Sequence, residues 1–422
     1  MEDKILSREA YDCYRFLIDH TNFTNSSTGY GLTLDRINNP ERASIAGTGF
    51  MLSALVIGAI NGWDKPECNR RRAFYTIKNF YDNIPHYNGM FAHYLEYANG
   101  KRYKKCEFST IDTALLISGM LTADSYFDMP ELSAFVDKIY QRIDWNKFVF
   151  TYRHRFVFRM AYNDITGGDY LQEANQGWIY RWSMMAEQLI MYILAAASPA
   201  VSSQLAKKLF LGFERTNGGY RDNWFVYTPL GSLFVYQYSH AWFDFRKYYD
   251  MSGYCWFNNS IQAVKANYNY CCDRKNDYKT FAAGLWGLSS CDSPNGYCGY
   301  GAPPFITYDN IDKFKERTDG TVAVYAILGS LPFAPEIVKA TVCNLADNYS
   351  QIIGPYGFYD SINLDAAWIS NDCLAIDKGI TLLMIDNYYN ETNWRYFMKH
   401  RLIKEGVRKL AFIRKEESDV DN

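Results

Sequence analysis

The segment LIMYILAAAS, residues 189–198, limits the possible folds of this chain more than any other stretch of its sequence. It is apolar on every side and lies between Glu187 and Pro199. It is too short to cross a bilayer, which takes about 20 apolar residues. The longer stretch 177–199 is also apolar nearly all round, and such a helix has to be internal. We therefore predict a helix over 177–199 that the rest of the protein encloses.

Three further stretches combine helical periodicity with signals for the start or the end of a helix. Residues 43–63 end in Asn-Gly, and residues 109–127 open with Ser109-x-x-Asp112, which is a capping-box pattern. Residues 334–349 place Pro335 near a first turn. Helices are therefore expected to dominate the fold.

The segments between these helices, such as 289–305 and 354–363, are rich in Gly, Pro, Asp and aromatic residues, and they lack the composition of flexible linkers. We find no domain boundary, and the absence of an internal repeat disfavours a solenoid. The sequence predicts one all-α domain over residues 1–422. We expect a helical toroid with inner and outer rings, loops that build a cleft at one end, and a polar tail from about 405 to 422.

The charge balance argues against two classes of partner. The chain has 44 Lys and Arg against 46 Asp and Glu, a net charge of -2 and a pI near 6.3, so it carries no electrostatic footprint for nucleic acid or an anionic membrane. Residues 1–20 are charged throughout and are typical of an amphipathic helix, with no signal-peptide core. The 10 Cys lack C-x-x-C spacing, which fits reduced thiols. We expect a cytoplasmic protein.

The stretch VYQYSHAWFDFR, residues 235–246, is unusually dense in aromatic and ionisable side chains. A wall that stacks on a neutral sugar and hydrogen-bonds its rim uses this mixture. An aromatic-rich helix with a surface pair between Asp244 and Arg246 uses it equally well. Both interpretations stay open on these residues alone.

Carboxylates are the remaining source of catalysis, because no motif for a metal, a nucleophile or a nucleotide is present and none of the six His has metal-ligand spacing. Glu187, placed on a mostly apolar helix face, should have its pKa raised by desolvation, as a general acid requires. A structural pair with a buried Arg or Tyr is the alternative.

Other ionisable residues have structural alternatives of similar weight. Asp112 and Asp377 stand near helix starts, where a capping role is expected. Glu336 follows Pro335, where the helix dipole favours an acid. His93, in GMFAHYLE, fits either the core or a cleft.

Several long blocks occur in one order along the chain: YGLTLDRINNPERASIAGTGF, EFSTIDTALLISGML, WGLSSCDSPNGYCGYGAPP, DGTVAVYAILGSLPFAPE and AIDKGITLLMIDN. In these blocks the chain resembles glycoside hydrolase family 144, the bacterial β-1,2-glucanases long described as glucoamylase-like proteins. The resemblance implies an (α/α)6 barrel that hydrolyses β-1,2-linked glucose chains with inversion, without a metal or an organic cofactor. The implied partner is β-1,2-glucan or its oligosaccharides, and no oligomeric state is indicated.

By position in the matching blocks, Glu187, Asp112 and Asp377 become the catalytic candidates. We expect Glu187 to stay protonated as the acid, and Asp112 or Asp377 to be held ionised by the helix start. Tyr238 or Trp242 becomes a stacking platform for sugar. The full set of expected substrate-binding residues is His93, Trp178, Trp182, Tyr238, His240, Trp242, Asp244, Tyr300, Glu336 and Asp360.

Two other functions remain compatible with these residues. One is a sugar-binding protein that keeps the cleft without turnover. The other is a transglycosylase that moves glycosyl groups between β-1,2 chains. Retention of all three acids favours an enzyme over the binding protein.

Overall fold

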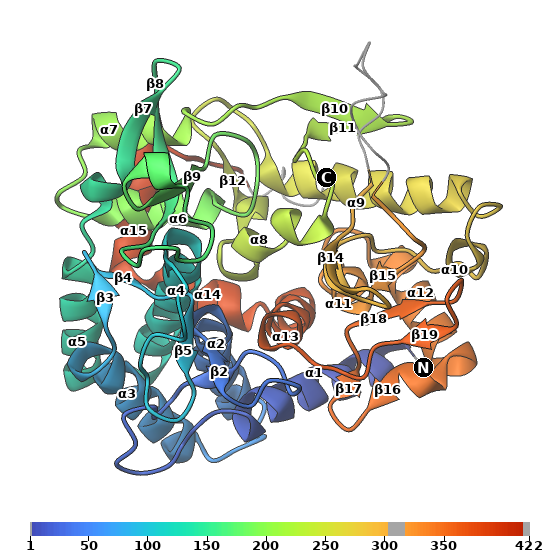
Figure 1. Cartoon of the computed structure of the whole chain (residues 1–422), viewed down its shortest axis with the longest axis horizontal. Coiled ribbons are helices and arrows are strands. Elements are labelled where there is room, and N and C mark those ends of the chain that lie inside the picture. The colour runs from blue at the N-terminus through green and yellow to red at the C-terminus, as the bar shows by residue number, and fades with distance from the viewer. Residues whose placement is uncertain (1, 303–316, 417–422) are drawn as a thin grey trace.

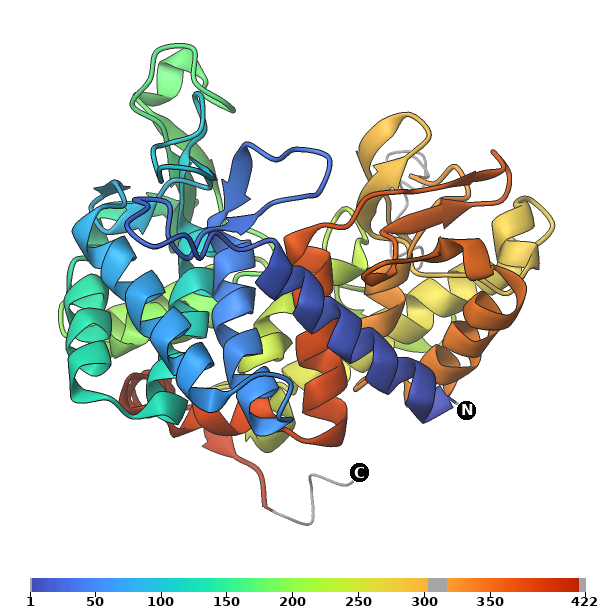
Figure 2. The same cartoon turned by 90° about the horizontal axis from the view of Figure 1, so that it is seen from below.

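Helices form the body of the protein, and most of the short strands lie on one side of it. The structure is a computed structural model that describes residues 2–302 and 317–416. Figure 1 shows the helices around the middle of the molecule, and Figure 2 shows the short strands and their loops gathered at the top of the turned view. The prediction of a mainly helical fold is confirmed, whereas the strands were not expected.

An inner set of helices is buried on almost every side. Contacts join α2 to α4, α4 to α6, α6 to α8 and α11 to α13, and α13 returns to contact α2. The step from α8 to α11 is made by Gln237, whose amide donates to the carbonyl of Ala326 at 2.7 Å. The inner helices are α2 (Ile45–Ile60), α4 (Thr110–Phe127), α6 (Leu189–Ala197), α8 (Tyr238–Trp242), α11 (Val324–Leu328) and α13 (Ala375–Tyr389).

The remaining longer helices bury one face only and pack outside the inner set, as amphipathic helices do. None of the helices within residues 2–302 and 317–416 is both long and apolar enough to span a membrane. These outer helices are α1 (Glu2–Asp19), α3 (Pro66–Asp82), α5 (Pro130–Gln141), α7 (Ser203–Phe210), α9 (Trp256–Asp273), α10 (Lys279–Ala282), α12 (Pro335–Asn348), α14 (Thr392–Lys399) and α15 (Arg401–Leu410).

The strands are short and pair antiparallel in small sheets. The first sheets are β1 (Thr33–Leu34), β2 (Arg42–Ser44) and β5 (Tyr94–Glu96); β3 (His86–Tyr87) and β4 (Met90–Phe91); and β6 (Phe108–Ser109), β7 (Val149–Tyr152), β8 (Arg155–Tyr162) and β9 (Trp178–Arg181). The later ones are β10 (Asn217–Tyr220) and β11 (Asn223–Val226); β12 (Tyr248–Tyr249) and β20 (Ile413–Arg414); β13 (Ser290–Ser293) and β14 (Gly296–Gly299); β15 (Val322–Ala323), β18 (Ser361–Asn363) and β19 (Trp368–Ile369); and β16 (Ile353–Gly354) and β17 (Gly357–Phe358).

Short 3₁₀ helices supply the remaining regular turns. They are η1 (Trp145–Phe148), η2 (Glu173–Asn175), η3 (Leu233–Tyr236), η4 (Phe245–Lys247) and η6 (Ser350–Ile352).

The backbones of α2 and α4 touch at two glycines. A Cβ on Gly119 would lie 2.0 Å from the carbonyl oxygen of Gly49, and a Cβ on Gly49 would lie 2.5 Å from that of Leu115. Both obstacles are backbone atoms of a packed helix, which cannot move aside as a flexible side chain could. Glycine at these two positions therefore sets the spacing of the two helices.

A buried ion pair ties the N-terminal helix α1 to the start of α13. The Lys378 ammonium lies 3.0 Å from Glu9 Oε1, and both side chains are almost fully buried. Glu9 Oε2 also accepts the backbone N–H of Phe358 at 2.9 Å. Because removal of either partner would leave the other charge buried and unpaired, this contact fixes how the two helices meet.

The structure differs from the sequence prediction in four places, one of which is that the expected loop 354–363 contains β17 and β18. The continuous helix expected over 177–199 is wrong, because residues 178–181 form β9 and the helix begins only at Leu189. The expected loop 289–305 contains the β13–β14 hairpin, and its last three residues lie outside the described part. Of the tail expected over about 405–422, residues 405–410 belong instead to α15 and residues 417–422 lie outside the described part.

Substitution of Gly119 by alanine should destabilise the protein. The added methyl overlaps the α2 backbone, and overpacking of this kind costs about 1–3 kcal/mol. The matched control is Gly299→Ala, where a Cβ meets nothing closer than the Ser290 hydroxyl at 3.7 Å. Thermal unfolding followed by circular dichroism should show a lower Tm for the first variant only, and an equal Tm for both would contradict this account of α2–α4 packing.

Candidate active site

A cleft of about 370 Å³ lies at the end of the body where the inner helices begin. First-turn residues of four inner helices line it, and Glu187 adds the turn before α6. Strands β8 and β9 and the β13–β14 hairpin contribute further lining residues. The lining residues from first turns are Ile111, Asp112, Tyr238, Tyr325 and Ile376.

A larger hollow of about 520 Å³ lies along α3, but its chemistry is different. Among the described residues that line it, Asp82 is the one carboxyl group, and it is paired with Lys78. The smaller cleft holds two carboxyl groups with shifted pKa values, those of Glu107 and Glu187. Acid-base chemistry therefore favours the smaller cleft as the site.

Glu187 has the properties of a proton donor at neutral pH. It lies in the turn before α6, so the prediction that Glu187 is on an apolar helix face is wrong. Burial nevertheless raises the pKa of this carboxyl to about 7, and the nearby charge of Asp112 adds to the effect. Ser239 holds the turn in place, because its hydroxyl donates to the Glu187 carbonyl at 2.6 Å.

Asp112 lies in the first turn of α4 with a histidine beside it. The Ser109 hydroxyl contacts Asp112 Oδ2 at 2.5 Å and also caps the helix at the Asp112 backbone N–H, as the sequence predicts. His93 Nε2 lies 3.6 Å from Asp112 Oδ1, and its Nδ1 lies 2.9 Å from Glu107 Oε1. Burial alone would lower the pKa of His93, but the two carboxylates outweigh it and raise this pKa to about 9. His93 is therefore a cation held between two anions.

Asp377, in the first turn of α13, forms a pair with Asp360 just before β18. Burial raises the pKa of both carboxyls, that of Asp360 to about 7, and the charge of Asp360 raises that of Asp377 further. Asp377 Oδ2 and Asp360 Oδ1 accept no hydrogen bond from the described residues. Burial beside a second carboxyl therefore opposes the helix dipole at Asp377, and the expectation that the helix start keeps Asp377 ionised stays a prediction.

Asp377 lies close to the floor of the cleft. Burial is the main cause of the raised pKa of Tyr238 and of Tyr297, and the charge of Asp377 is the second. The same charge also raises the pKa of Tyr325. All three tyrosines line the cleft. Asp377 therefore lies just beneath the residues that line the cleft. Asp112 and Glu187, in contrast, belong to the lining itself.

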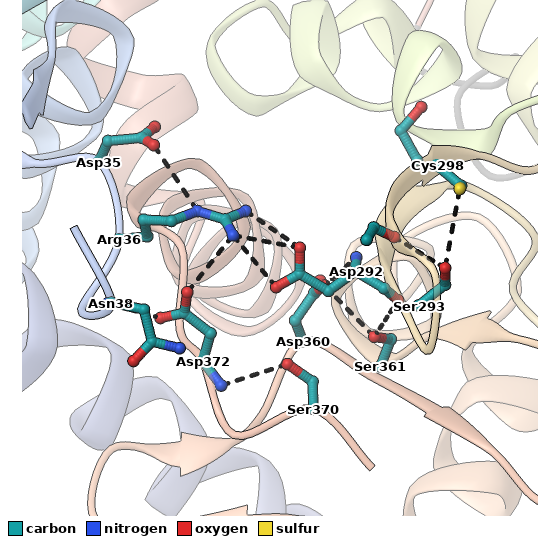
Figure 3. Close-up of polar contacts among 12 residues, drawn as sticks. Asp35, Arg36, Asn38, Asp292, Ser293, Cys298, Asp360, Ser361, Ser370 and Asp372 are labelled. Carbon is teal, nitrogen blue, oxygen red and sulfur yellow. Dashed lines mark hydrogen bonds and ion pairs between the residues drawn. The ribbon is translucent and has the colours of Figure 1, made fainter. Parts of the chain in front are cut away.

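Arg36 joins three separate segments beside this pair, as Figure 3 shows. Its guanidinium bonds both carboxylate oxygens of Asp292 on β13, at 3.2 and 3.3 Å, and lies 3.4 Å from Asp372 before α13. The backbone N–H of Asp292 in turn donates to Asp360 Oδ2 at 2.6 Å. The positive charge of Arg36 lowers the pKa of Asp360 and Asp377 and so partly offsets their burial.

Four of the expected sugar-binding residues lie at or below the cleft. His93, Trp182 and Tyr238 line it, and the Trp182 indole donates to the Thr110 hydroxyl at 3.0 Å. Asp360 lies beneath the lining and contacts Asp292 and Ser361.

Three expected sugar-binding residues of the stretch 235–246 are in the core, so their predicted location in the cleft is wrong. Trp242 is fully buried and donates to Ser53 Oγ at 2.9 Å. His240 is buried with its Nε2 on Ser260, and burial lowers its pKa to about 3. Asp244 is buried against Arg246 and Lys247. Protein partners therefore surround all three side chains, although His240 Nδ1 has no hydrogen-bond partner among the described residues.

Three more expected positions also lie outside the lining. Trp178, on β9, packs against Tyr162 with ring centroids 5.0 Å apart. The Tyr300 hydroxyl is occupied by Asp319 at 2.7 Å. Glu336 is exposed in the first turn of α12, where the helix dipole accounts for it.

Several cleft residues were not singled out from the sequence. Tyr170, Tyr180 and Tyr297 form an exposed aromatic rim, with 63%, 51% and 52% of their surface accessible. With 36 Tyr in the chain, composition gives no signal that separates these from the others. Glu107 and Arg36 lie within or beside the quoted blocks, but their roles depend on partners far away in sequence.

The comparisons with known proteins now identify the family. The sequence profile described as "Putative glucoamylase" matches residues 179–401, which is more than half of the chain. The chain belongs to this glucoamylase family. The matched range contains Glu187, Asp360 and Asp377, and it leaves Asp112 and His93 outside.

One curated relative is an enzyme. The protein named "Exo beta-1,2-glucooligosaccharide sophorohydrolase (non-reducing end)" from Parabacteroides distasonis is 24% identical and covers 90% of this chain. The chain spans only 55% of the length of that relative.

Two solved structures share the fold of this family member. A "putative glucoamylase" from Bacteroides uniformis has a TM-score of 0.83 at 25% identity, with 98% of each chain covered. An endo-beta-1,2-glucanase from Chitinophaga pinensis, solved with sophorotriose and glucose, has a TM-score of 0.83 at 23% identity, with 98% of this chain and 99% of that chain covered.

Within residues 2–302 and 317–416, no group of three or more His, Cys, Asp or Glu side chains is placed to hold a metal ion. The ionisable groups of the cleft instead pair with one another, as His93 does with Asp112 and Glu107.

Replacement of Glu107 by glutamine should lower the pKa of His93. The variant loses one of two carboxylates that stabilise the imidazolium, so the pKa should fall from about 9 toward the ordinary value of 6.5. A pH titration of the histidine ring resonances by NMR measures this directly. His240 is the internal control and should stay neutral throughout, and a His93 that titrates near 6.5 in the unchanged protein would contradict the charge assignment.

Proposed function

We propose that this protein is a glycoside hydrolase that cleaves β-1,2-glucan or β-1,2-linked gluco-oligosaccharides with inversion. Membership of the family and the activity named for the Parabacteroides relative support the reaction class and the linkage. The cleft supports it independently, because it combines a protonated carboxyl, a second carboxyl pair and an aromatic rim.

We further propose that the helices form a single (α/α)6 barrel. The six inner helices follow one another in chain order, and the last contacts the first. An outer helix follows each inner helix up to α12 along the chain, and α1 packs on α13. This arrangement is what a ring of inner helices inside a ring of outer helices requires.

The mechanism is supported by the position that the carboxyls take in this proposed ring. Counting in the order α2, α4, α6, α8, α11 and α13, the helices α6 and α13 are three steps apart in either direction. Glu187 at α6 and Asp377 at α13 are therefore on opposite sides of the cleft. Asp112, on α4, is next to Glu187. Inversion needs an acid and a base on opposite faces of the scissile linkage, so Glu187 and Asp377 are the matched pair.

In this mechanism Glu187 gives its proton to the departing glycosidic oxygen. A water on the far side attacks the anomeric carbon, and the pair of Asp377 and Asp360 takes the proton that the water loses. The pair suits this task because burial and the charge of Asp360 raise the pKa of Asp377, so that an ionised Asp377 takes up a proton readily, and Asp377 Oδ2 has no hydrogen-bond donor among the described residues. Asp112, held by the His93 cation, is placed to orient Glu187 and the sugar hydroxyls.

Product analysis tests the function. Incubation with β-1,2-glucan and with sophoro-oligosaccharides should release shorter chains, and NMR of the first products should show the α-anomer, because the β-linkage is inverted. Cleavage of another glucan only would remove the linkage assignment. Saturable binding without cleavage would favour a sugar-binding protein, and longer or cyclic products would favour a transglycosylase. The size of the released products also tells exo from endo action.

Replacement of Glu187 by glutamine should abolish turnover while binding persists. Glutamine keeps the shape of the side chain and loses the transferable proton, and loss of a general acid costs about 10²–10⁴-fold in rate. The control is Glu336→Gln, an exposed residue on α12 that should keep full activity. Measurement of kcat and of oligosaccharide affinity by calorimetry separates the two effects. A folded Glu187→Gln protein with normal kcat would remove Glu187 from the mechanism.

The pH dependence of kcat/KM should be bell-shaped with a maximum near neutral pH. The basic limb reports loss of the Glu187 proton, whose pKa is about 7, and the acidic limb reports protonation of the Asp377–Asp360 pair. Because the Asp360 charge raises the pKa of Asp377, the Asp360→Asn substitution should move the acidic limb to lower pH. The basic limb should stay in place, and an acidic limb that does not move would exclude this pair as the base.

A further inference from the structure

The sheet that forms one wall of the cleft carries two arginines that the proposed hydrolysis does not use. Arg159 on β8 lies directly opposite Arg181 on β9. Like charges in this position destabilise a pair of strands. A pairing of this kind persists only if something offsets the repulsion.

No carboxylate of the described side chains offsets it. Every ion pair of the described residues involves other cations, and neither guanidinium has a hydrogen-bond acceptor among the described atoms. The Arg181 Nε is buried without any partner. Burial and then the charge of Arg181 lower the pKa of Arg159, which is the sign of two cations in proximity. The two arginines therefore form a site of unbalanced positive charge.

Aromatic rings hold the two guanidinium groups in fixed planes. The Arg159 Cζ lies 3.6 Å from the centroid of Phe150, and the Arg181 Cζ lies 3.8 Å from that of Tyr152. Both rings belong to β7. A guanidinium that stacks through its face keeps the N–H groups along its edge free, and this edge is the part that binds an oxyanion through two parallel hydrogen bonds.

The arginines adjoin the cleft through the next residue pair on the same face of the sheet. Ala161 and Ile179 are cross-strand partners two residues away from Arg159 and Arg181, and both line the cleft. Figure 1 shows β7, β8 and β9 together at one edge of the molecule. A group bound by the two arginines is therefore close to a chain that leaves the cleft over Ile179.

We propose that Arg159 and Arg181 bind a tetrahedral oxyanion, namely a phosphate group carried as a substituent on the glucan chain. The binding of phosphate rests on the arginine pair alone, whereas the glucan as its carrier rests on the proposed function. Two guanidinium groups on adjacent strands present donors from two directions, which suits the several oxygens of a phosphate better than one carboxylate.

The first test uses inorganic phosphate and needs no turnover. Calorimetric titration at low ionic strength, against chloride of equal ionic strength, should show saturable phosphate binding to the unchanged protein. The Arg159→Gln/Arg181→Gln variant should bind at least tenfold more weakly. The control Lys147→Gln/Arg155→Gln removes two exposed positive charges from the same sheet region and should retain binding. Absence of saturable binding, or equal loss in both double variants, would overturn the site.

The second test identifies the source of the phosphate. A β-1,2-gluco-oligosaccharide that bears a phosphate monoester should have a KM about tenfold lower than the neutral oligosaccharide of the same length. The Arg159→Gln/Arg181→Gln variant should lose this difference and keep its kcat on the neutral substrate. If inorganic phosphate binds but the two oligosaccharides have the same KM, the glucan is overturned as the carrier.

Folding and the proposed hydrolysis are tested separately from the site. Removal of two opposed charges relieves repulsion, so the glutamine variant should have a Tm no lower than the unchanged protein. The Arg159→Lys/Arg181→Lys variant keeps both charges without the planar edges and should bind phosphate more weakly than the unchanged protein. If the protein cleaves no β-1,2-glucan at all, the phosphate titration still decides the arginine site.

Discussion

The starts of the buried helices converge at one end of the molecule, and the chemistry of the cleft depends on this convergence. A helix start offers free N–H groups and a partial positive charge, which favour an anion, whereas burial disfavours one. Asp112 and Asp377 stand in the first turns of α4 and α13, and Glu187 precedes α6. In each case the nearest ionisable partner decides whether the effect of the helix start or that of burial prevails. His93 supplies a cation to Asp112, Asp360 supplies a second acid to Asp377, and Glu187 has no cation among the influences on its pKa.

Contacts between segments far apart in sequence hold these carboxyls in place. Gly49 and Gly119 let α2 and α4 touch, and the Glu9–Lys378 pair fixes α1 against the turn that follows Asp377. Arg36 then joins the β13 strand to the segment before α13. Asp377 and Glu187 are thus held by separate sets of contacts. A change on one side, such as loss of Arg36, should alter the Asp377–Asp360 pair more than Glu187.

Local features of this fold are predictable from the sequence, and features that rest on distant partners are not. The capping pattern at Ser109 places the start of α4 correctly, and the apolar surroundings of Glu187 indicate its raised pKa even though the predicted helix is a turn. His240, Trp242 and Asp244 have the composition of a sugar-binding wall. The contact of Trp242 with Ser53 spans almost 190 residues and that of His240 with Ser260 spans 20, whereas the Asp244–Arg246 pair is local and was one of the two interpretations of this stretch. The Asp360–Asp377 pair likewise exists only once the loop before β18 meets α13.

The position of Glu187 and Asp377 on either side of one glycosidic bond is the central claim, and a crystal structure of the Glu187→Gln protein with a bound β-1,2-gluco-oligosaccharide tests it most directly. The account predicts that one linkage lies between the two side chains, with the carboxyl groups about 6.5–9.5 Å apart and a water on the Asp377 side. An oligosaccharide bound with both side chains on the same face of the sugar, or bound away from α13, would contradict it.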